Sequence, residues 1–249
     1  APGNIEQCFE AGWRAFNLAE KYQCPVIVLT DLYQSAAVRT VEKEILDFSK
    51  IPIERGALLT EADLEKLKSE YKRHTFTDSG ISPRTIPGHP KAVFMTTSDE
   101  HDEQGHVIED AETRIKMMEK RMKKLELAVE EMRAPEVYGA KNAELTLIGW
   151  GSTWGALRET VDHLNQDGFS ANMLHFVDIW PFPEEKVTLL LKEAKYTVCV
   201  EGNYTGQLAT IIRSQTGIGV NKRILRYDGR PISVGFILEK LKDEVRLHV

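Results

Sequence analysis

The sequence AELTLIGWGSTWGALR, residues 143–158, decides the fold of the second half of the chain. Leu145 to Ile148 is a short run without charge, which is typical of a strand buried on both faces. Three glycines follow it, at Gly149, Gly151 and Gly155. Apolar residues then recur at helical spacing, at Leu157, Val161 and Leu164. A strand, a glycine turn and a helix start form the opening unit of an open α/β sheet, which binds ligands at its carboxyl edge.

The same alternation continues to the end of the chain. Further strands are predicted at residues 172–177, 197–200 and 223–225, and helices at 154–167, 184–194, 204–215 and 234–244. Regular alternation of strand and helix indicates a parallel sheet with right-handed crossovers. The sequence therefore predicts a doubly wound α/β domain over residues 143–249, joined by a linker at 133–142.

The first part of the chain is less regular. Asn4 is a suitable cap for a helix with one apolar face, followed by a predicted buried strand at Val26 to Leu29. No strand precedes that helix, although a doubly wound sheet needs one, so we expect the beginning of this domain to be missing. Residues 58–71 resemble a polar helix, and Ala92 to Met95 a short strand. Asp110 can cap a helix with a short heptad stripe, suited to core packing or a subunit contact. Its members are Ile115, Met118, Met122, Leu125, Val129 and Met132.

Composition excludes several classes of protein. The net charge of −6 argues against nucleic acid or an anionic membrane surface as the main partner. No apolar run approaches the roughly 20 residues of a membrane helix, and a cytoplasmic location is the default expectation. The cysteines are far apart and form no C-x-x-C pair, so this chain alone predicts neither a disulfide framework nor an iron–sulfur cluster.

The glycine turn after residue 148 has two interpretations. Glycines there could let the pyrophosphate of NAD or FAD approach a helix N-terminus, with Asp178 as the ribose carboxylate. However, Gly155 comes one place late, Asp178 lies beyond the usual spacing, and Trp150 would crowd the phosphate. A tight turn that packs a helix on a strand is the favoured alternative.

A matching turn, EGNYTG, occupies residues 201–206. Both turns follow strands, so a small molecule or a partner subunit could lie across them. A partner subunit suits these turns at least as well as a small ligand does. The candidate interface residues are Gly151, Trp154, Asn203 and Tyr204.

The long irregular stretch of residues 77–106 is rich in polar groups, and loops of this length in compact domains are often functional. His101 and His106 match no standard zinc or EF-hand spacing, so a polar loop near an active site is favoured over a metal site. Ser82 and Arg84 belong to a turn that could hold an arginine for a carboxylate or phosphate, or for a structural salt bridge. The candidate binding residues of the stretch are Ser82, Arg84, Glu100, His101, Asp102 and His106.

Six motifs resemble one family. They are GNIEQCFEAGWRAFNLAEKYQCPVIVLTD, TDSGISPRTIPG, DEHDEQGH, LTLIGWGSTWGALRE, IWPFP and EGNYTGQLA. In this order they are similar to the alpha subunit of 2-oxoacid:ferredoxin oxidoreductases, in particular the 2-oxoglutarate type. The resemblance implies a partial pyrimidine-type thiamine-diphosphate domain at residues 1–134 and a transketolase C-terminal-like domain at 143–249.

The resemblance also implies an activity. Such enzymes oxidatively decarboxylate a 2-oxoacid, use coenzyme A, and pass electrons to ferredoxin within a hetero-oligomer. Thiamine diphosphate, Mg²⁺ and an iron–sulfur cluster would lie mainly on the beta subunit, with none bound by this chain alone. The family's motifs for the aminopyrimidine ring and substrate arginine lie upstream of APGN, where this sequence starts, so no catalytic residue is assigned. Alternatives from other classes are a folded but non-catalytic interaction module and, less favoured, an NAD- or FAD-binding oxidoreductase.

Overall fold

The computed structural model describes residues 1–245, which form two compact units. The sheet unit comprises Ala1–Ala11, Val28–Asp47 and the chain from Met132 onwards. The helix–loop unit comprises Gly12–Ile27 and Phe48–Glu131. Each unit therefore joins segments that are distant in the sequence, and each is described separately below.

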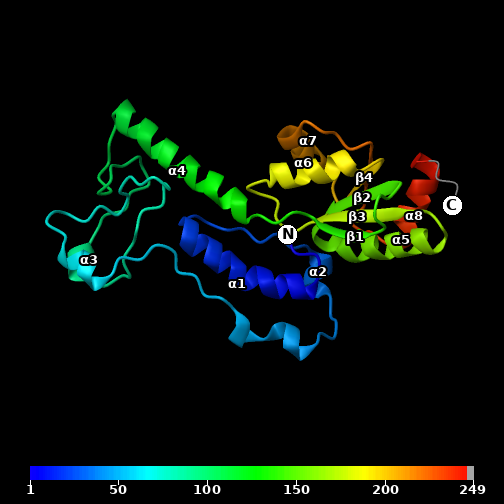
Figure 1. Cartoon of the computed structure of the whole chain (residues 1–249), viewed down its shortest axis with the longest axis horizontal. Coiled ribbons are helices and arrows are strands. Elements are labelled where there is room, and N and C mark those ends of the chain that lie inside the picture. The colour runs from blue at the N-terminus through cyan, green and yellow to red at the C-terminus, as the bar shows by residue number, and fades with distance from the viewer. Residues whose placement is uncertain (246–249) are drawn as a thin grey trace. The chain divides into compact units, whose positions relative to one another are not determined.

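The sheet unit contains a five-stranded mixed sheet (Figure 1). Its strands are arranged in the order β1-β3-β2-β4-β5. β2 pairs in parallel with β3 and β4, and β4 pairs in parallel with β5, whereas β1 is antiparallel to β3. The bounds are β1 Glu136–Gly139, β2 Leu145–Trp150, β3 Ala171–Phe176, β4 Thr197–Glu201 and β5 Lys222–Leu225. The predicted α/β class is confirmed, and the strand order switches direction between β2 and β4.

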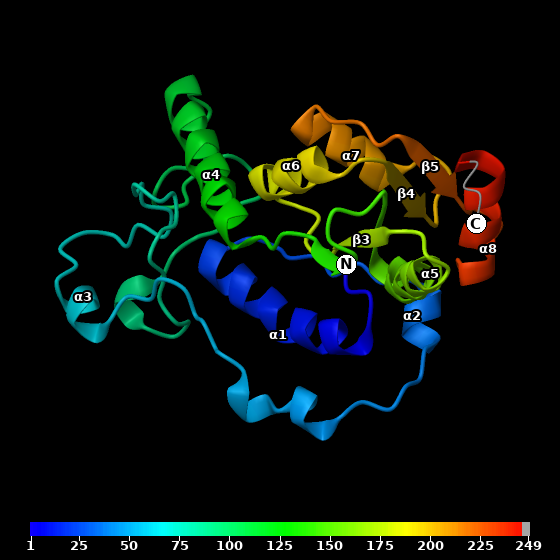
Figure 2. The same cartoon turned by 45° about the vertical axis from the view of Figure 1, so that its right-hand side comes forward.

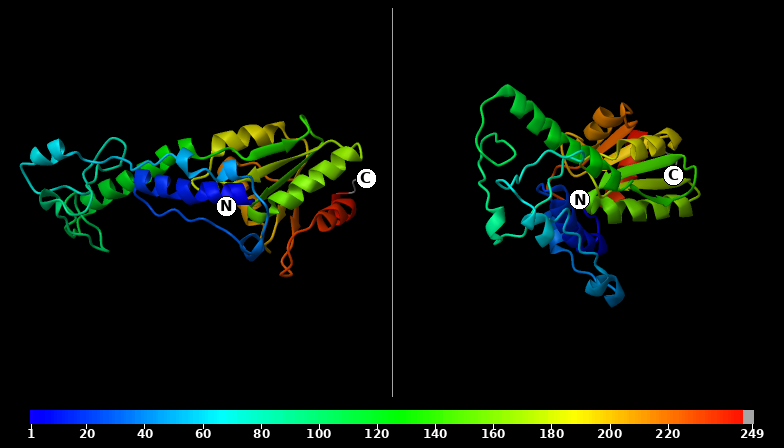
Figure 3. Two further views of the ribbon diagram at one scale, coloured as in Figure 1. Left: turned by 90° about the horizontal axis from the view of Figure 1, so that it is seen from below. Right: turned by 60° about the vertical axis from the view of Figure 1, so that its left-hand side comes forward.

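Helices cover both faces of this sheet, as a doubly wound fold requires (Figure 3). α5 (Trp154–Gln166) and α8 (Val234–Lys240) pack on one face, where Leu145 and Leu147 of β2 are buried. α6 (Glu184–Glu193) and α7 (Gln207–Thr216) pack on the other, around Ile148. The alternation of β2 residues between two cores explains why the strand carries no charged residue and is buried on both faces. No helix among residues 1–245 is both long and apolar enough to cross a membrane.

Three details of the sheet unit differ from the prediction. The predicted linker at 133–142 contains β1, a short edge strand with alternating exposure. The helix predicted from Tyr204 begins at Gln207, because Gly206 has a left-handed conformation (φ 68°) and the preceding residues form a turn. The last predicted helix is α-helical only to Lys240 and continues as a π turn at Leu241–Val245.

In the helix–loop unit, irregular chain precedes the long helix α4, Ala111–Glu131 (Figure 2). Asp110 caps α4 as predicted, since its Oδ1 accepts the N–H of Thr113 at 2.8 Å. α1, Ile5–Tyr22, runs through both units, and its predicted cap Asn4 accepts the N–H of Gln7 at 2.8 Å. The short helices are α2 at Leu32–Ala36 and α3 at Glu61–Glu65, with 3₁₀ turns at Lys43–Leu46, Phe48–Lys50, Pro90–Ala92 and Gly151–Thr153.

The prediction of a buried strand at Val26 to Leu29 is wrong. These four residues belong to no strand of the described chain, and all are exposed. A buried strand needs neighbours for its backbone groups, and residues 1–245 provide none here. The strand at Ala92 to Met95 is also absent, because Pro90–Ala92 forms a 3₁₀ turn. Within residues 58–71 only α3 is helical, and Leu64 and Tyr71 form a small buried core instead of a solvated face.

Candidate functional site

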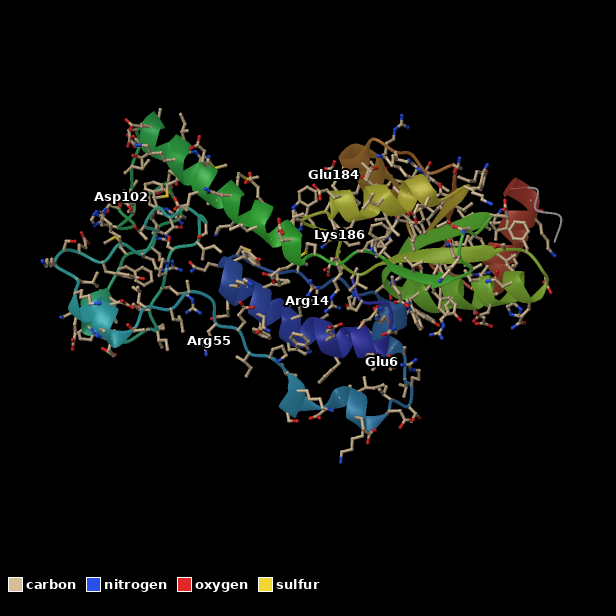
Figure 4. The ribbon with its side chains drawn as sticks, in the orientation of Figure 1. Glu6, Arg14, Arg55, Asp102, Glu184 and Lys186 are labelled. Atoms are coloured by element: carbon tan, nitrogen blue, oxygen red, sulfur yellow. The ribbon has the colours of Figure 1, made fainter. Side chains whose placement is uncertain are left out.

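Residues 100–108 form a tight turn in the helix–loop unit, beside the beginning of α4 (Figure 4). Asp102 organises this turn, since its Oδ1 accepts the backbone N–H groups of Gln104, Gly105 and His106, each at 2.9 Å. Burial alone would raise the pKa of Asp102, but these three bonds lower it below its usual range. Gly105 has φ 99°, and a Cβ there would lie 2.3 Å from the carbonyl oxygen of Met95. The Asp102 carboxylate and the conformation of Gly105 thus fix the shape of the turn.

Glu100 fastens this turn to α4. Its carboxylate accepts two bonds from Arg121, at 3.0 and 2.6 Å, and a third from Arg114. The hydrogen bonds from Arg121, and then that from Arg114, lower the pKa of Glu100 to about 2 despite partial burial. No group of three or more His, Cys, Asp or Glu suited to a metal occurs among residues 1–245. Through its bonds to Arg114 and Arg121, Glu100 anchors the turn to α4.

Two histidines meet at the same turn. The ring centroids of His74 and His101 are 4.1 Å apart. Burial, with the nearby His101 and Arg73, lowers the pKa of His74 to about 4, so this ring is neutral at physiological pH. His106 faces the carboxylates of Glu70 and Asp102 at 3.3 and 3.6 Å. The structure thus brings Glu100, His101, Asp102 and His106 together on one turn.

Ser82 and Arg84 lie elsewhere in the same unit and point to internal partners. Ser82 is buried, and its hydroxyl donates to the carbonyl oxygen of Thr75 at 2.8 Å. Arg84 forms an ion pair with Glu20 and donates to the carbonyl oxygen of Arg55 at 3.2 Å. Glu20 is thus the partner that a structural salt bridge of Arg84 requires. A role of Arg84 in substrate binding stays a prediction.

Sequence reasoning missed a group of cations in this unit. Arg73, Lys120 and Lys124 are half-buried and close enough to influence one another. Burial, and then the neighbouring cations, lowers the pKa of Lys120 to about 8. The available signal was the spacing of Lys120 and Lys124, which places both on one side of a helix. Arg73 could not have been added from spacing, since it is distant in sequence.

In the sheet unit, the glycine turn after β2 is closed by the chain itself. A Cβ at Gly149 would lie 2.5 Å from Leu157 Cδ1 and from Thr153 Oγ1, so this glycine permits close packing of helix on strand. A Cβ at Gly3 would lie 2.5 Å from Trp154 Cβ, which places the N-terminal segment directly over the turn. The indole of Trp154 donates to Glu136 at 3.0 Å. Gly151 takes the left-handed conformation (φ 56°) that the turn requires.

The turn after β4 is closed by Glu201. This fully buried carboxylate accepts the N–H groups of Leu208 and Ala209, at 2.8 and 3.1 Å, and the indole N–H of Trp150 at 3.3 Å. Asn203 donates to it at 2.9 Å and accepts the N–H of Gly206 at 2.7 Å. An internal carboxylate thus occupies the position where an anionic ligand would bind the N-terminus of α7. This geometry disfavours a dinucleotide here.

Aromatic side chains remain exposed at the same edge of the sheet. Tyr204 and Tyr227 form an edge-to-face pair with centroids 4.8 Å apart, and they are 71% and 64% exposed. Trp180, after β3, is 62% exposed. Of the four candidate interface residues, Tyr204 therefore presents the largest free surface, whereas Trp154 is partly covered.

Comparison with known proteins identifies the class of this fold. Residues 1–120 match the family "Pyruvate flavodoxin/ferredoxin oxidoreductase, thiamine diP-bdg", and residues 143–237 match "Pyruvate:ferredoxin oxidoreductase core domain II". The two matches make the chain similar to enzymes of the pyruvate:ferredoxin oxidoreductase class. More particularly, nearly the whole chain is similar to the alpha subunits of 2-oxoacid:ferredoxin oxidoreductases.

Individual relatives agree with this assignment. The alpha subunit of 2-oxoacid:ferredoxin oxidoreductase 1 from Sulfurisphaera tokodaii is 37% identical over 98% of this chain and 37% of its own length. The alpha subunit from Saccharolobus solfataricus is 34% identical, with 99% and 38% covered. The solved 2-oxoglutarate:ferredoxin oxidoreductase from Magnetococcus marinus superposes with a TM-score of 0.84 at 28% identity, over 98% of this chain and 41% of that one. The chain thus spans about two fifths of these relatives.

Thiamine diphosphate, named in the first family's description, does not fit the turns described above. All first-turn N–H groups of α7 are taken by Glu201 and Asn203, and Gly3 covers the turn after β2. Residues 1–245 also offer no acidic cluster for Mg²⁺. We therefore derive no chemical step through the cofactor on these residues.

Proposed function

We propose that this chain forms part of the alpha subunit of a thiamine-diphosphate-dependent 2-oxoacid:ferredoxin oxidoreductase. The reaction would be oxidative decarboxylation of 2-oxoglutarate to an acyl-CoA, with electrons passed to ferredoxin. The observation that carries the proposal is the 37% identity to the Sulfurisphaera alpha subunit across 98% of this chain. The choice of 2-oxoglutarate is supported by the Magnetococcus enzyme, which was solved with 2-oxoglutarate, coenzyme A and succinyl-CoA bound.

The cofactors of this enzyme would lie mainly outside this chain. Bound thiamine diphosphate would supply the reactive carbon that attacks the 2-oxo group. We place its diphosphate end, its Mg²⁺ and the iron–sulfur cluster on a beta subunit, within a hetero-oligomer. Support comes from Cys8, Cys24 and Cys199, which form no cluster, and from the closed turn at Glu201. Residues 1–134 would form the pyrimidine-type domain and residues 143–249 the transketolase C-terminal-like domain.

The turn of residues 100–108 would edge the entrance to the active site or contact the beta subunit. This role is supported by the polar groups that hold the turn. Asp102 fixes the backbone of the turn, and Glu100 fixes the position of the turn against α4. A loop held in this way can orient a substrate without moving during turnover. Ser82 and Arg84 would stabilise the neighbouring segment, and His101 and His106 are the groups left to meet a ligand.

The substrate proposal is tested on the complete enzyme, purified from its native cells with its partner subunits. Initial rates of viologen reduction with coenzyme A are compared for 2-oxoglutarate, pyruvate and 2-oxoisovalerate. A kcat/KM highest for 2-oxoglutarate supports the proposal. A preference for either of the other acids would contradict the 2-oxoglutarate assignment while keeping the enzyme class. A complex that reduces viologen with none of them would favour the interaction module.

A further inference from the structure

Two cations of the helix–loop unit, Arg73 and Lys124, contact the same residue, Gln23. Arg73 Nη1 donates to Gln23 Oε1 at 2.9 Å, and Lys124 Nζ donates to the carbonyl oxygen of Gln23 at 3.1 Å. Lys120 is half-buried and lies one helical turn before Lys124, on the same side of α4. Gln23 itself has a left-handed backbone (φ 50°), which is uncommon for a residue other than glycine. The arrangement is thus fixed by backbone as well as side chains.

Neighbouring carboxylates do not neutralise these cations. None of Arg73, Lys120 and Lys124 forms an ion pair with an acidic side chain among the residues that the structure describes. Glu100 is already held by Arg114 and Arg121. Glu103 accepts bonds from Lys72 Nζ at 2.7 Å and from Thr75 and Phe76 at 3.0 Å. Its charge raises the pKa of Lys120, but by less than burial and the neighbouring cations lower it.

Such a group of half-buried like charges is costly unless an anion joins it. Burial first, and then the charges of Lys124 and Arg73, lowers the pKa of Lys120. Burial also lowers the pKa of Lys124, where Cys24 raises it and Arg73 lowers it further. Burial also lowers the pKa of Arg73. His74, whose ring is neutral at physiological pH, adds no charge. A bound anion would relieve the repulsion among these half-buried cations.

We propose that Arg73, Lys120 and Lys124 form a binding site for a phosphate group. Three cations match a doubly charged phosphate better than a single carboxylate, and an arginine fork with two ammonium groups supplies donors in several directions. One source of such a group, which rests on the proposed function, is the adenosine bisphosphate portion of coenzyme A. Free phosphate is the other source.

The test measures acylation of lysines in the wild-type complete enzyme. Trace labelling with acetic anhydride, read by mass spectrometry, gives the relative reactivity of Lys120 with increasing inorganic phosphate, adenosine 3′,5′-bisphosphate or 2-oxoglutarate. Lys116 is the internal control, since it lies on α4 one turn away and is exposed and paired with Glu112 at 2.6 Å.

Saturable protection of Lys120, with Lys116 unaffected, is expected for the phosphate compounds. Stronger protection by the bisphosphate indicates coenzyme A as the source, and equal protection indicates free phosphate. Absence of protection by both, or protection by 2-oxoglutarate alone, would overturn the phosphate site. Viologen reduction is assayed separately, so loss of the site and failure of the proposed function are distinguishable.

A matched pair of variants provides a second readout. Lys120→Met removes one cation and should weaken binding of the bisphosphate by about tenfold or more, as expected for loss of a charge-assisted bond. Lys116→Met should leave this affinity unchanged. Equal affinities of the two variants, both folded by circular dichroism, would contradict the assignment of Lys120.

Discussion

A single carboxylate, Glu100, links the turn of residues 100–108 to α4. Its pKa is about 2 in the folded chain against an ordinary value of 4.5, because Arg121 and Arg114 bind the ionised form. A carboxyl whose pKa is lowered by folding adds stability above its unfolded pKa. That contribution is lost as the pH falls from 4.5 towards 2.

We therefore expect Glu100→Gln to lower the free energy of unfolding by about 1–2 kcal/mol at neutral pH. The deficit relative to wild type should shrink as the pH falls below 4.5. Urea unfolding of the wild type and of Glu100→Gln at a series of pH values measures the difference in free energy of unfolding. Glu112→Gln is the control, because its exposed pair with Lys116 should contribute little. A deficit independent of pH would show that Glu100 acts through packing and not through its charge.

At the scale of the secondary-structure elements, Gly149 in β2 and Gly155 in α5 should respond oppositely to substitution by alanine. A Cβ at Gly149 meets Leu157 and Thr153 at 2.5 Å, so Gly149→Ala should destabilise the protein by about 1–3 kcal/mol. At Gly155, in the first turn of α5, a Cβ would meet no atom within 4 Å, and Gly155→Ala should stabilise by up to about 1 kcal/mol. Thermal unfolding measures both. Equal effects would contradict the packing role of Gly149.

The α/β elements of the sheet unit could be predicted because their signals are local. Apolar runs mark β2 and β4, and helical spacing marks α5. β1 could not be predicted, because an exposed four-residue edge strand has too weak a pattern. The segment from Val26 misleads for the opposite reason, since its apolar run has no neighbouring strand in the described chain.

The candidate site could be predicted only by residue type. The sequence singles out the turn containing Glu100 and Asp102, but the arginines that hold Glu100 lie 14 and 21 residues away. The group of Arg73, Lys120 and Lys124 comes from separate parts of the sequence and converges only through folding. Likewise, nothing in the local pattern shows that Glu201 occupies the N-terminus of α7.

At the scale of the whole molecule, substitution of Tyr204 tests whether this surface contacts a partner subunit. Tyr204 is 71% exposed and stacks edge-on against Tyr227, so it offers an aromatic anchor to a partner subunit. Tyr204→Ala should weaken association of the subunits by about tenfold or more, with little change in thermal stability. Analytical ultracentrifugation measures this, and Tyr204→Phe, which keeps the ring, should assemble normally. Unchanged assembly with Tyr204→Ala would remove this surface from the interface.

The most direct measurement asks where the electrons from the 2-oxoacid go. The complete native enzyme is mixed anaerobically with 2-oxoglutarate, with and without coenzyme A, and reduction of viologen and of NAD⁺ is followed separately. We predict rapid viologen reduction that requires coenzyme A and no reduction of NAD⁺, in agreement with the turns closed by Glu201 and Gly3. Reduction of NAD⁺ without viologen reduction would contradict it and would assign the chain to a dinucleotide-dependent oxidoreductase.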